Sequence, residues 1–138
     1  MDDNRKLKLF MNLSQTLTGF DDLPEEIGRD YLSRLSLSFG DQAITALLTS
    51  YETLLTSSSN IVNAVKNYII DDKDKGSLAR ESIMLWYTAQ FKDLNGQLQN
   101  GTDTQYQNSL IWRAIQAHPP GFAGGQYGYW KDAPEDLT

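Results

Sequence analysis

The stretch DQAITALLTSYETLL, residues 41–55, decides the fold class because its large apolar residues recur at steps of three and four. These residues are Ile44, Leu47, Leu48, Tyr51, Leu54 and Leu55. Such spacing places them on one broad face of an α-helix. Asp41 is predicted to be the N-cap, because a carboxylate there accepts a hydrogen bond from a free backbone N–H. The polar run 56–60 favours bonds to its own backbone and is predicted to end the helix.

Two further helices are predicted before residue 41. Their apolar positions are Phe10, Leu13 and Leu17 in the first and Ile27, Tyr31 and Leu35 in the second. Gly19 and Gly40 follow these runs and are predicted to end them, because glycine suits the last position of a helix. Pro24, with acids beside it, favours the start of the second helix.

Three more segments with helical spacing follow residue 60. Residues 61–69 predict a fourth helix, although their β-branched content also admits a strand. Residues 71–76 are predicted to be a charged loop, with Ser77 capping a fifth helix. The inward residues of that helix are predicted to be Leu78, Ile83, Trp86, Tyr87 and Phe91. Turns are expected at Asn95-Gly96 and Asn100-Gly101.

Thr102 and Gln105 have the spacing of a capping box and predict the start of a sixth helix. Its apolar positions are Tyr106, Leu110, Ala114 and Ile115. The helix must end before Pro119, because a proline disfavours helical geometry in the residue that precedes it.

The last twenty residues differ in kind from the rest of the chain. Residues 119–134 hold three of the four prolines and four of the ten glycines, so this segment is not expected to be helical. It also carries Phe122, Tyr127, Tyr129 and Trp130, which are costly to leave in water. These four aromatic residues are predicted to contact a partner protein, with closure of the chain's own core as the open alternative. The sequence therefore predicts an all-α, single-domain bundle of five or six helices over residues 1–118, with an irregular extended arm over 119–138 that belongs to the same domain.

Composition excludes several classes of function. A chain of 138 residues suits one domain, and its net charge of −6 argues against a nucleic-acid binder. No run approaches the roughly 18 apolar residues of a membrane span, and the segment after Arg5, Lys6 and Lys8 is amphipathic, unlike an export signal. With no cysteine and a single histidine, His118, the chain offers little for catalysis, and we expect no catalytic, cofactor or metal site.

Two local patterns resemble ligand-binding loops but lack the features that such loops require. The acids of residues 71–76 alternate as in a calcium loop, but the glycine comes one step early and the twelfth position counted from Asp72 is Ile83 instead of glutamate. The glycines of residues 121–128 lack the preceding strand and following helix of a phosphate-binding loop. Both are predicted to be ordinary loops.

Three segments together resemble one family. LSQTLTGFDDL (13–23) is similar to its opening S-x-x-L-T-G motif, and IMLWYTA (83–89) to its central W-Y-T-G motif, with Ala89 in place of glycine. YQNSLIW (106–112), the proline pair 119–120 and GQYGYWKDAP (125–134) resemble its closing motif. The family is the small subunit of bacterial membrane-bound, FAD-dependent sugar and polyol dehydrogenases of the sorbitol, fructose and gluconate type.

The resemblance implies a non-catalytic subunit that stabilises and helps to mature or export a partner. In this family FAD belongs to the large subunit, and a cytochrome c subunit takes up the electrons. The implied location is the periplasm, attached to the inner membrane through the complex. The alternative that the residues leave open is a stand-alone helical binding protein or chaperone for an unrelated partner.

Overall fold

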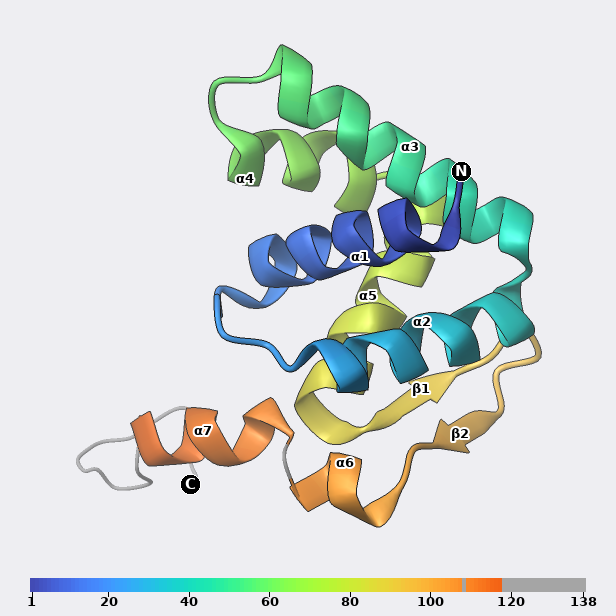
Figure 1. Cartoon of the computed structure of the whole chain (residues 1–138), viewed down its shortest axis with the longest axis vertical. Coiled ribbons are helices and arrows are strands. Elements are labelled where there is room, and N and C mark those ends of the chain that lie inside the picture. Colours follow the sequence, from blue (N-terminus) through green and yellow to red (C-terminus); the bar gives the residue numbers. More distant parts are fainter. Residues whose placement is uncertain (108, 118–138) are drawn as a thin grey trace.

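The computed structural model describes residues 1–107 and 109–117, and helices dominate this part of the chain (Figure 1). The elements are α1 (Asp3–Thr18), α2 (Glu25–Phe39), α3 (Asp41–Ser57), α4 (Ile61–Val65), η1 (Lys66–Ile70), α5 (Lys73–Thr88), β1 (Gln90–Lys92), β2 (Leu98–Asn100), α6 (Asp103–Gln107) and α7 (Leu110–Ala117). The predicted all-α class is confirmed, with one short antiparallel hairpin, β1–β2, added to it.

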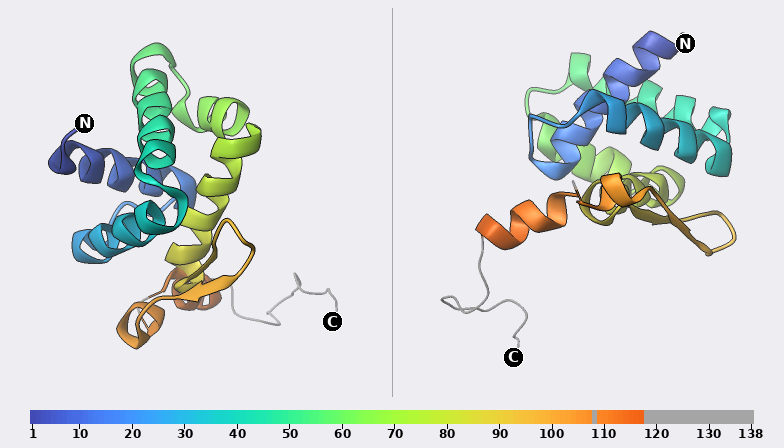
Figure 2. Two further views of the ribbon diagram at one scale, coloured as in Figure 1. Left: turned by 90° about the vertical axis from the view of Figure 1, so that its right-hand side faces the viewer. Right: turned by 60° about the horizontal axis from the view of Figure 1, so that its bottom comes forward.

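The core lies where α1, α2, α3 and α5 pack against one another. Figure 1 shows α1 between α3 and α2, and the left view of Figure 2 shows α5 on one side of these three helices. The largest fully buried side chains are Phe10, Leu13, Tyr31, Leu35, Ile44, Leu47, Leu48, Tyr51, Ile69 and Leu85. The helical stripe in residues 41–55 is therefore confirmed as a core face, although Leu55 at its end is 39% exposed.

Helices α1 and α2 each end at a glycine, as predicted. Gly19 takes a left-handed conformation with φ 80° after α1, and its N–H donates to the Gln15 carbonyl at 2.9 Å. Gly40 lies between α2 and α3 with φ 93°. The prediction that Asp41 caps α3 is wrong, because Asp41 is the first residue of that helix and its carboxylate pairs with Lys6 of α1.

The open choice between helix and strand for residues 61–69 is resolved in favour of a helix. The Asn60 side chain accepts a hydrogen bond from the Asn63 backbone N–H and so starts α4, which continues directly into the π-helical segment η1. Ile69 is fully buried and turns the inner face of η1 towards the core. Tyr68 points outward and is 66% exposed.

The predicted charged loop over residues 71–76 and the cap at Ser77 are wrong. Helix α5 already begins at Lys73, because the Asp72 carboxylate accepts hydrogen bonds from the backbone N–H groups of Asp74 and Lys75 at 3.2 and 2.9 Å. Gly76 lies inside α5 against the end of η1. A Cβ atom at Gly76 would lie 2.3 Å from the Ile70 carbonyl oxygen, so only glycine permits this close approach.

The end of α5 turns into the hairpin through Ala89. This residue has φ 59°, and it is the one non-glycine residue with positive φ within the described ranges. Phe91 is buried as predicted, but it lies on β1 instead of on the helix and packs against Phe39 with ring centroids 6.2 Å apart. Gly96, with φ 77°, forms the predicted turn between the two strands.

The predicted sixth helix is divided into α6 and α7. The Tyr106 carbonyl accepts hydrogen bonds from the Ser109 backbone N–H at 3.1 Å and from the Trp112 indole N–H at 3.0 Å. These bonds take the place of the helical bond to Leu110, so the chain changes direction between the two elements. None of the helices in the described ranges is both long and apolar enough to cross a lipid bilayer.

Candidate docking surface

The four residues that the sequence singled out for partner contact lie outside the described residues: Phe122, Tyr127, Tyr129 and Trp130. The structure does describe the helix that leads towards them, α7, and the element before it, α6. Within the described residues, the candidate site is therefore the surface around these two elements.

An aromatic pair lies exposed on this surface. The rings of Tyr106 on α6 and Trp112 on α7 meet edge to face, with centroids 5.6 Å apart and planes at 81°. Tyr106 is 48% and Trp112 42% exposed, although aromatic rings of this size gain free energy when they leave water. The indole N–H already donates to the Tyr106 carbonyl, so the apolar faces of the two rings remain for contact with another molecule.

The end of α5 lies next to Tyr106. Thr88 and Tyr106 line the same small hollow of about 280 Å³, between the end of α5 and the start of α6. Met84 lies one helical turn before Thr88 and is 44% exposed. The two rings of Tyr106 and Trp112 form one exposed apolar surface, which we call the aromatic strip. Helical spacing alone does not predict this exposed surface, because it places Tyr106 on the buried apolar face of a single continuous sixth helix.

Polar contacts to α2 hold α6 in place. The predicted capping box is confirmed: the Gln105 N–H donates to the Thr102 hydroxyl at 3.1 Å, and the Thr102 N–H donates to the Gln105 side-chain carbonyl at 2.8 Å. The Gln105 amide also donates to the carboxylate of Asp30, which Arg34 binds at 2.6 Å. Partial burial by itself would raise the pKa of Asp30, but the bonds from Arg34 and Gln105 keep that pKa below its usual value.

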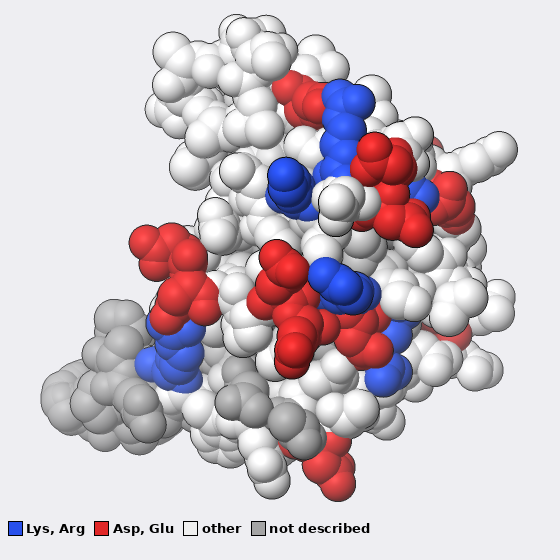
Figure 3. Space-filling model, in the orientation of Figure 1, with Lys and Arg blue, Asp and Glu red and all other residues white. Residues whose placement is uncertain are grey.

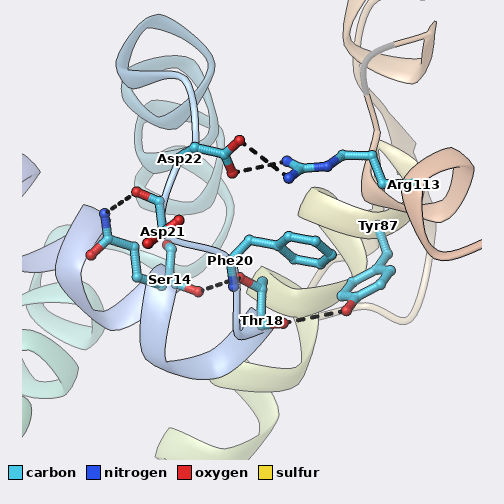
Figure 4. Close-up of polar contacts among 8 residues, drawn as sticks. Ser14, Thr18, Phe20, Asp21, Asp22, Tyr87 and Arg113 are labelled. Carbon is cyan, nitrogen blue, oxygen red and sulfur yellow. Dashed lines mark hydrogen bonds and ion pairs between the residues drawn. The ribbon is translucent and has the colours of Figure 1, made fainter. Parts of the chain in front are cut away.

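Helix α7 is attached to the loop between α1 and α2. Leu110 is buried at its start, and the Arg113 guanidinium donates to both carboxylate oxygens of Asp22 at 3.0 and 3.2 Å. The same guanidinium lies 4.4 Å from the centre of the Phe20 ring. Figure 4 shows Arg113 reaching from α7 across the Phe20 ring to Asp22. The hydrogen bonds from Arg113 hold the pKa of the Asp22 carboxyl below its usual value.

The loop that receives Arg113 is itself fixed to α1 and α5. The Thr18 hydroxyl donates to the Ser14 carbonyl at 2.8 Å and accepts a bond from the Phe20 N–H at 3.3 Å. From α5, the Tyr87 hydroxyl donates to the Thr18 carbonyl at 3.5 Å (Figure 4). The opening and central segments of the family resemblance therefore meet at the attachment point of α7.

Charged side chains are unevenly distributed over the molecule. Figure 3 shows acidic and basic groups interspersed over α1 and α2, whereas the end formed by α4 and the last turns of α3 is white. In the sequence, residues 53–65 contain no acidic or basic side chain. Val62 and Tyr68, 64% and 66% exposed, lie near this uncharged end, far along the chain from the aromatic strip.

The groove beside the N-terminus of α5 does not fit a flavin dinucleotide. A groove of about 590 Å³ lies beside the N-terminus of α5 and is lined by Asp72 and Asp74. Flavin dinucleotides place a pyrophosphate on free backbone N–H groups at a helix N-terminus after a strand. Here the Asp72 carboxylate accepts bonds from two of those N–H groups, so the N-terminus of α5 does not fit the pyrophosphate of FAD. No three His, Asp or Glu side chains gather into a metal site within the same ranges.

The fold and this surface define a small helical protein with an exposed aromatic strip on α6 and α7. The chain matches, over residues 1–134, the family model described as "Membrane bound FAD containing D-sorbitol dehydrogenase", and it belongs to that family. It is thus a subunit of an FAD-containing sorbitol dehydrogenase complex, and FAD belongs to that complex. No curated protein and no solved structure matches the chain significantly.

Proposed function

We propose that this chain is the non-catalytic small subunit that stabilises the FAD-containing large subunit of a sorbitol-type dehydrogenase and helps it to mature. The aromatic strip and the residues Phe122, Tyr127, Tyr129 and Trp130 form the contact with the large subunit. The observation that carries the proposal is the exposed Tyr106–Trp112 pair, which stands directly before the aromatic C-terminal segment. The family match extends over that segment as well, up to residue 134.

Aromatic residues suit this role for a physical reason. They bury a large area while freezing few rotatable bonds, so they dominate the energetics of many protein interfaces. Burying a large apolar side chain contributes about 1.5–3 kcal/mol. Several aromatic residues in one contiguous contact are enough to hold a subunit, even after the entropic cost of association is subtracted.

The resemblance extends the proposal to the rest of the complex. The complex works in the periplasm, attached to the inner membrane, and a cytochrome c subunit accepts electrons from the flavin. The substrate is a sugar or polyol and is bound by the large subunit. The described residues of this chain contribute to the complex by binding the large subunit, and they supply no catalytic group.

Co-expression of this chain with the large subunit tests the proposal. The double variant Tyr129→Ala/Trp130→Ala and the double variant Tyr106→Ala/Trp112→Ala should each release the large subunit during affinity purification of the small one. The flavin content and solubility of the large subunit should fall in parallel. Tyr68→Ala, an exposed aromatic residue on η1, is the matched control and should leave the complex intact.

Circular dichroism of the isolated variants distinguishes docking from folding. Helix content and cooperative unfolding should be preserved in both double variants. Loss of cooperative unfolding in the Tyr129→Ala/Trp130→Ala variant would show that these residues belong to the chain's own core. Retention of a flavin-loaded large subunit by both double variants would refute the proposed interface.

A further inference from the structure

Arg113 makes two kinds of contact at once, and both join α7 to the loop before α2. Its guanidinium binds the Asp22 carboxylate through two hydrogen bonds, and it lies over the face of the Phe20 ring at 4.4 Å. A guanidinium bound in this forked manner has its plane fixed by the carboxylate, and the ring beneath it fixes its height. The contact therefore restricts both the position and the rotation of α7 (Figure 4).

The exposure of the pair argues for a role in geometry more than in stability. The side chains of Arg113 and Asp22 are 42% and 63% exposed. Ion pairs that are open to solvent contribute little to the free energy of unfolding. The start of α7 is already held by buried Leu110 and by the indole bond of Trp112 to Tyr106, so the fold does not depend on Arg113.

The geometry points to Arg113 as a positioning residue for assembly: by holding α7 on Asp22 and Phe20, it sets the angle at which the aromatic strip meets the large subunit. The inference rests on the proposed function and adds a residue that acts without touching the partner. Trp112 precedes Arg113 in the same helical turn, so a rotation of α7 at Arg113 also turns one ring of the strip.

A double-mutant cycle on the affinity for the large subunit separates positioning from direct contact. The variants are Arg113→Gln, Asp22→Asn and the two combined, each compared with the unaltered chain. If Arg113 acts through Asp22, each single change weakens binding about tenfold through lost preorganisation, and the double change weakens it no further. Arg113→Lys retains the charge and should bind more tightly than Arg113→Gln, though less tightly than the unaltered chain.

Two further measurements make the result specific. Thermal unfolding and helix content of the isolated variants should match those of the unaltered chain, because the affected pair is exposed. Arg29→Gln is the control, since it breaks an exposed ion pair with Glu25 (3.2 Å) on α2 and should not alter the affinity.

The outcomes that overturn the inference differ from those that overturn the proposed function. An Asp22→Asn variant that binds as tightly as the unaltered chain, or losses that add in the double variant, would show that Arg113 does not act through Asp22. A large drop in the unfolding temperature would assign Arg113 to the stability of the fold. Absence of binding by the unaltered chain would refute the proposed function itself, and this inference with it.

Discussion

The four packed helices α1, α2, α3 and α5 and the C-terminal part, residues 90–117, are held by different forces. In the core between the four helices the contacts are mainly apolar, and Leu13, Leu35 and Leu48 are 0% exposed. The C-terminal part has two buried apolar anchors, Phe91 and Leu110, and is otherwise attached through polar side chains, as in the contacts of Gln105 with Asp30 and of Arg113 with Asp22. Apolar burial is strong but has no direction, whereas a hydrogen bond is weaker and fixes an angle.

The comparison separates the residues that stabilise the fold from the residues that attach α6 and α7 to it. The packed helices supply most of the free energy of folding, since they contain nearly all of the large buried side chains. The polar contacts supply little of that free energy, but they join α6 to α2 and α7 to the loop before α2. Substitutions in the two regions should therefore differ both in the size and in the kind of their effects.

The largest effect is expected from Leu48→Ala. Leu48 is fully buried in the middle of α3, and its replacement leaves a cavity that costs about 2–5 kcal/mol of the free energy of unfolding. Urea denaturation followed by circular dichroism measures this loss. Leu55→Ala on the same helix is the control and should cost less than about 1 kcal/mol, because that side chain is 39% exposed. Equal losses at the two positions would contradict the location of the core.

A smaller, pH-dependent effect is expected from Asp30→Asn. The pKa of Asp30 is lowered in the folded state, so the ionised carboxylate stabilises the fold above its unfolded pKa of about 3.9. This contribution is lost as the pH falls through the lower folded pKa. The Asn variant should be less stable at pH 7 by less than about 1 kcal/mol, because Asp30 is partly exposed.

Thermal unfolding of both proteins between pH 7 and pH 2 checks this expectation. The difference between their unfolding temperatures should shrink steadily below about pH 4 and vanish at the acid end. A difference that stays constant over this range would show that the Asp30 carboxylate does not stabilise the fold through its charge.

The smallest effect, and one of opposite sign, is expected from Ala89→Gly. Ala89 has φ 59° at the end of α5, a conformation that costs an L-residue about 1–2 kcal/mol and costs glycine almost nothing. Loss of the buried methyl group offsets part of this gain, so the net stabilisation should be about 0.5 kcal/mol. A higher denaturant midpoint with an unchanged slope supports the reasoning, and a lower midpoint would mean that the methyl contact outweighs the backbone strain.

Much of the fold could be predicted because the decisive signals are local. The stripe over residues 41–55, the stop at Gly19 and the capping box of Thr102 and Gln105 each depend on residues within a few positions of one another. The start of α5 was misplaced because Gly76 looked like the end of a loop. Only the approach of Ile70, from the preceding segment, explains why a glycine is needed inside that helix.

The candidate site was harder to predict, since it depends on contacts between distant residues. The pairing of Arg113 with Asp22 and the stacking on Phe20 have no signature in residue spacing. The break between α6 and α7 arises because the Trp112 indole binds the Tyr106 carbonyl, which a helical pattern does not reveal. A clue was present, however: Tyr106 and Trp112 both belong to the closing motif of the family resemblance, although Trp112 lies outside the predicted apolar face.

Arg113 and Asp22 are 91 positions apart in the chain, and this separation has a consequence during protein synthesis. The ribosome releases the residues around Asp22 long before those around Arg113, so the contact between the two side chains cannot form until residue 113 has emerged. A chain that ends before residue 113 can form its first helices, but it lacks the contact of Arg113 with Asp22 that holds α7. Only a chain that has been translated past residue 113 can therefore hold α7 in place through this contact.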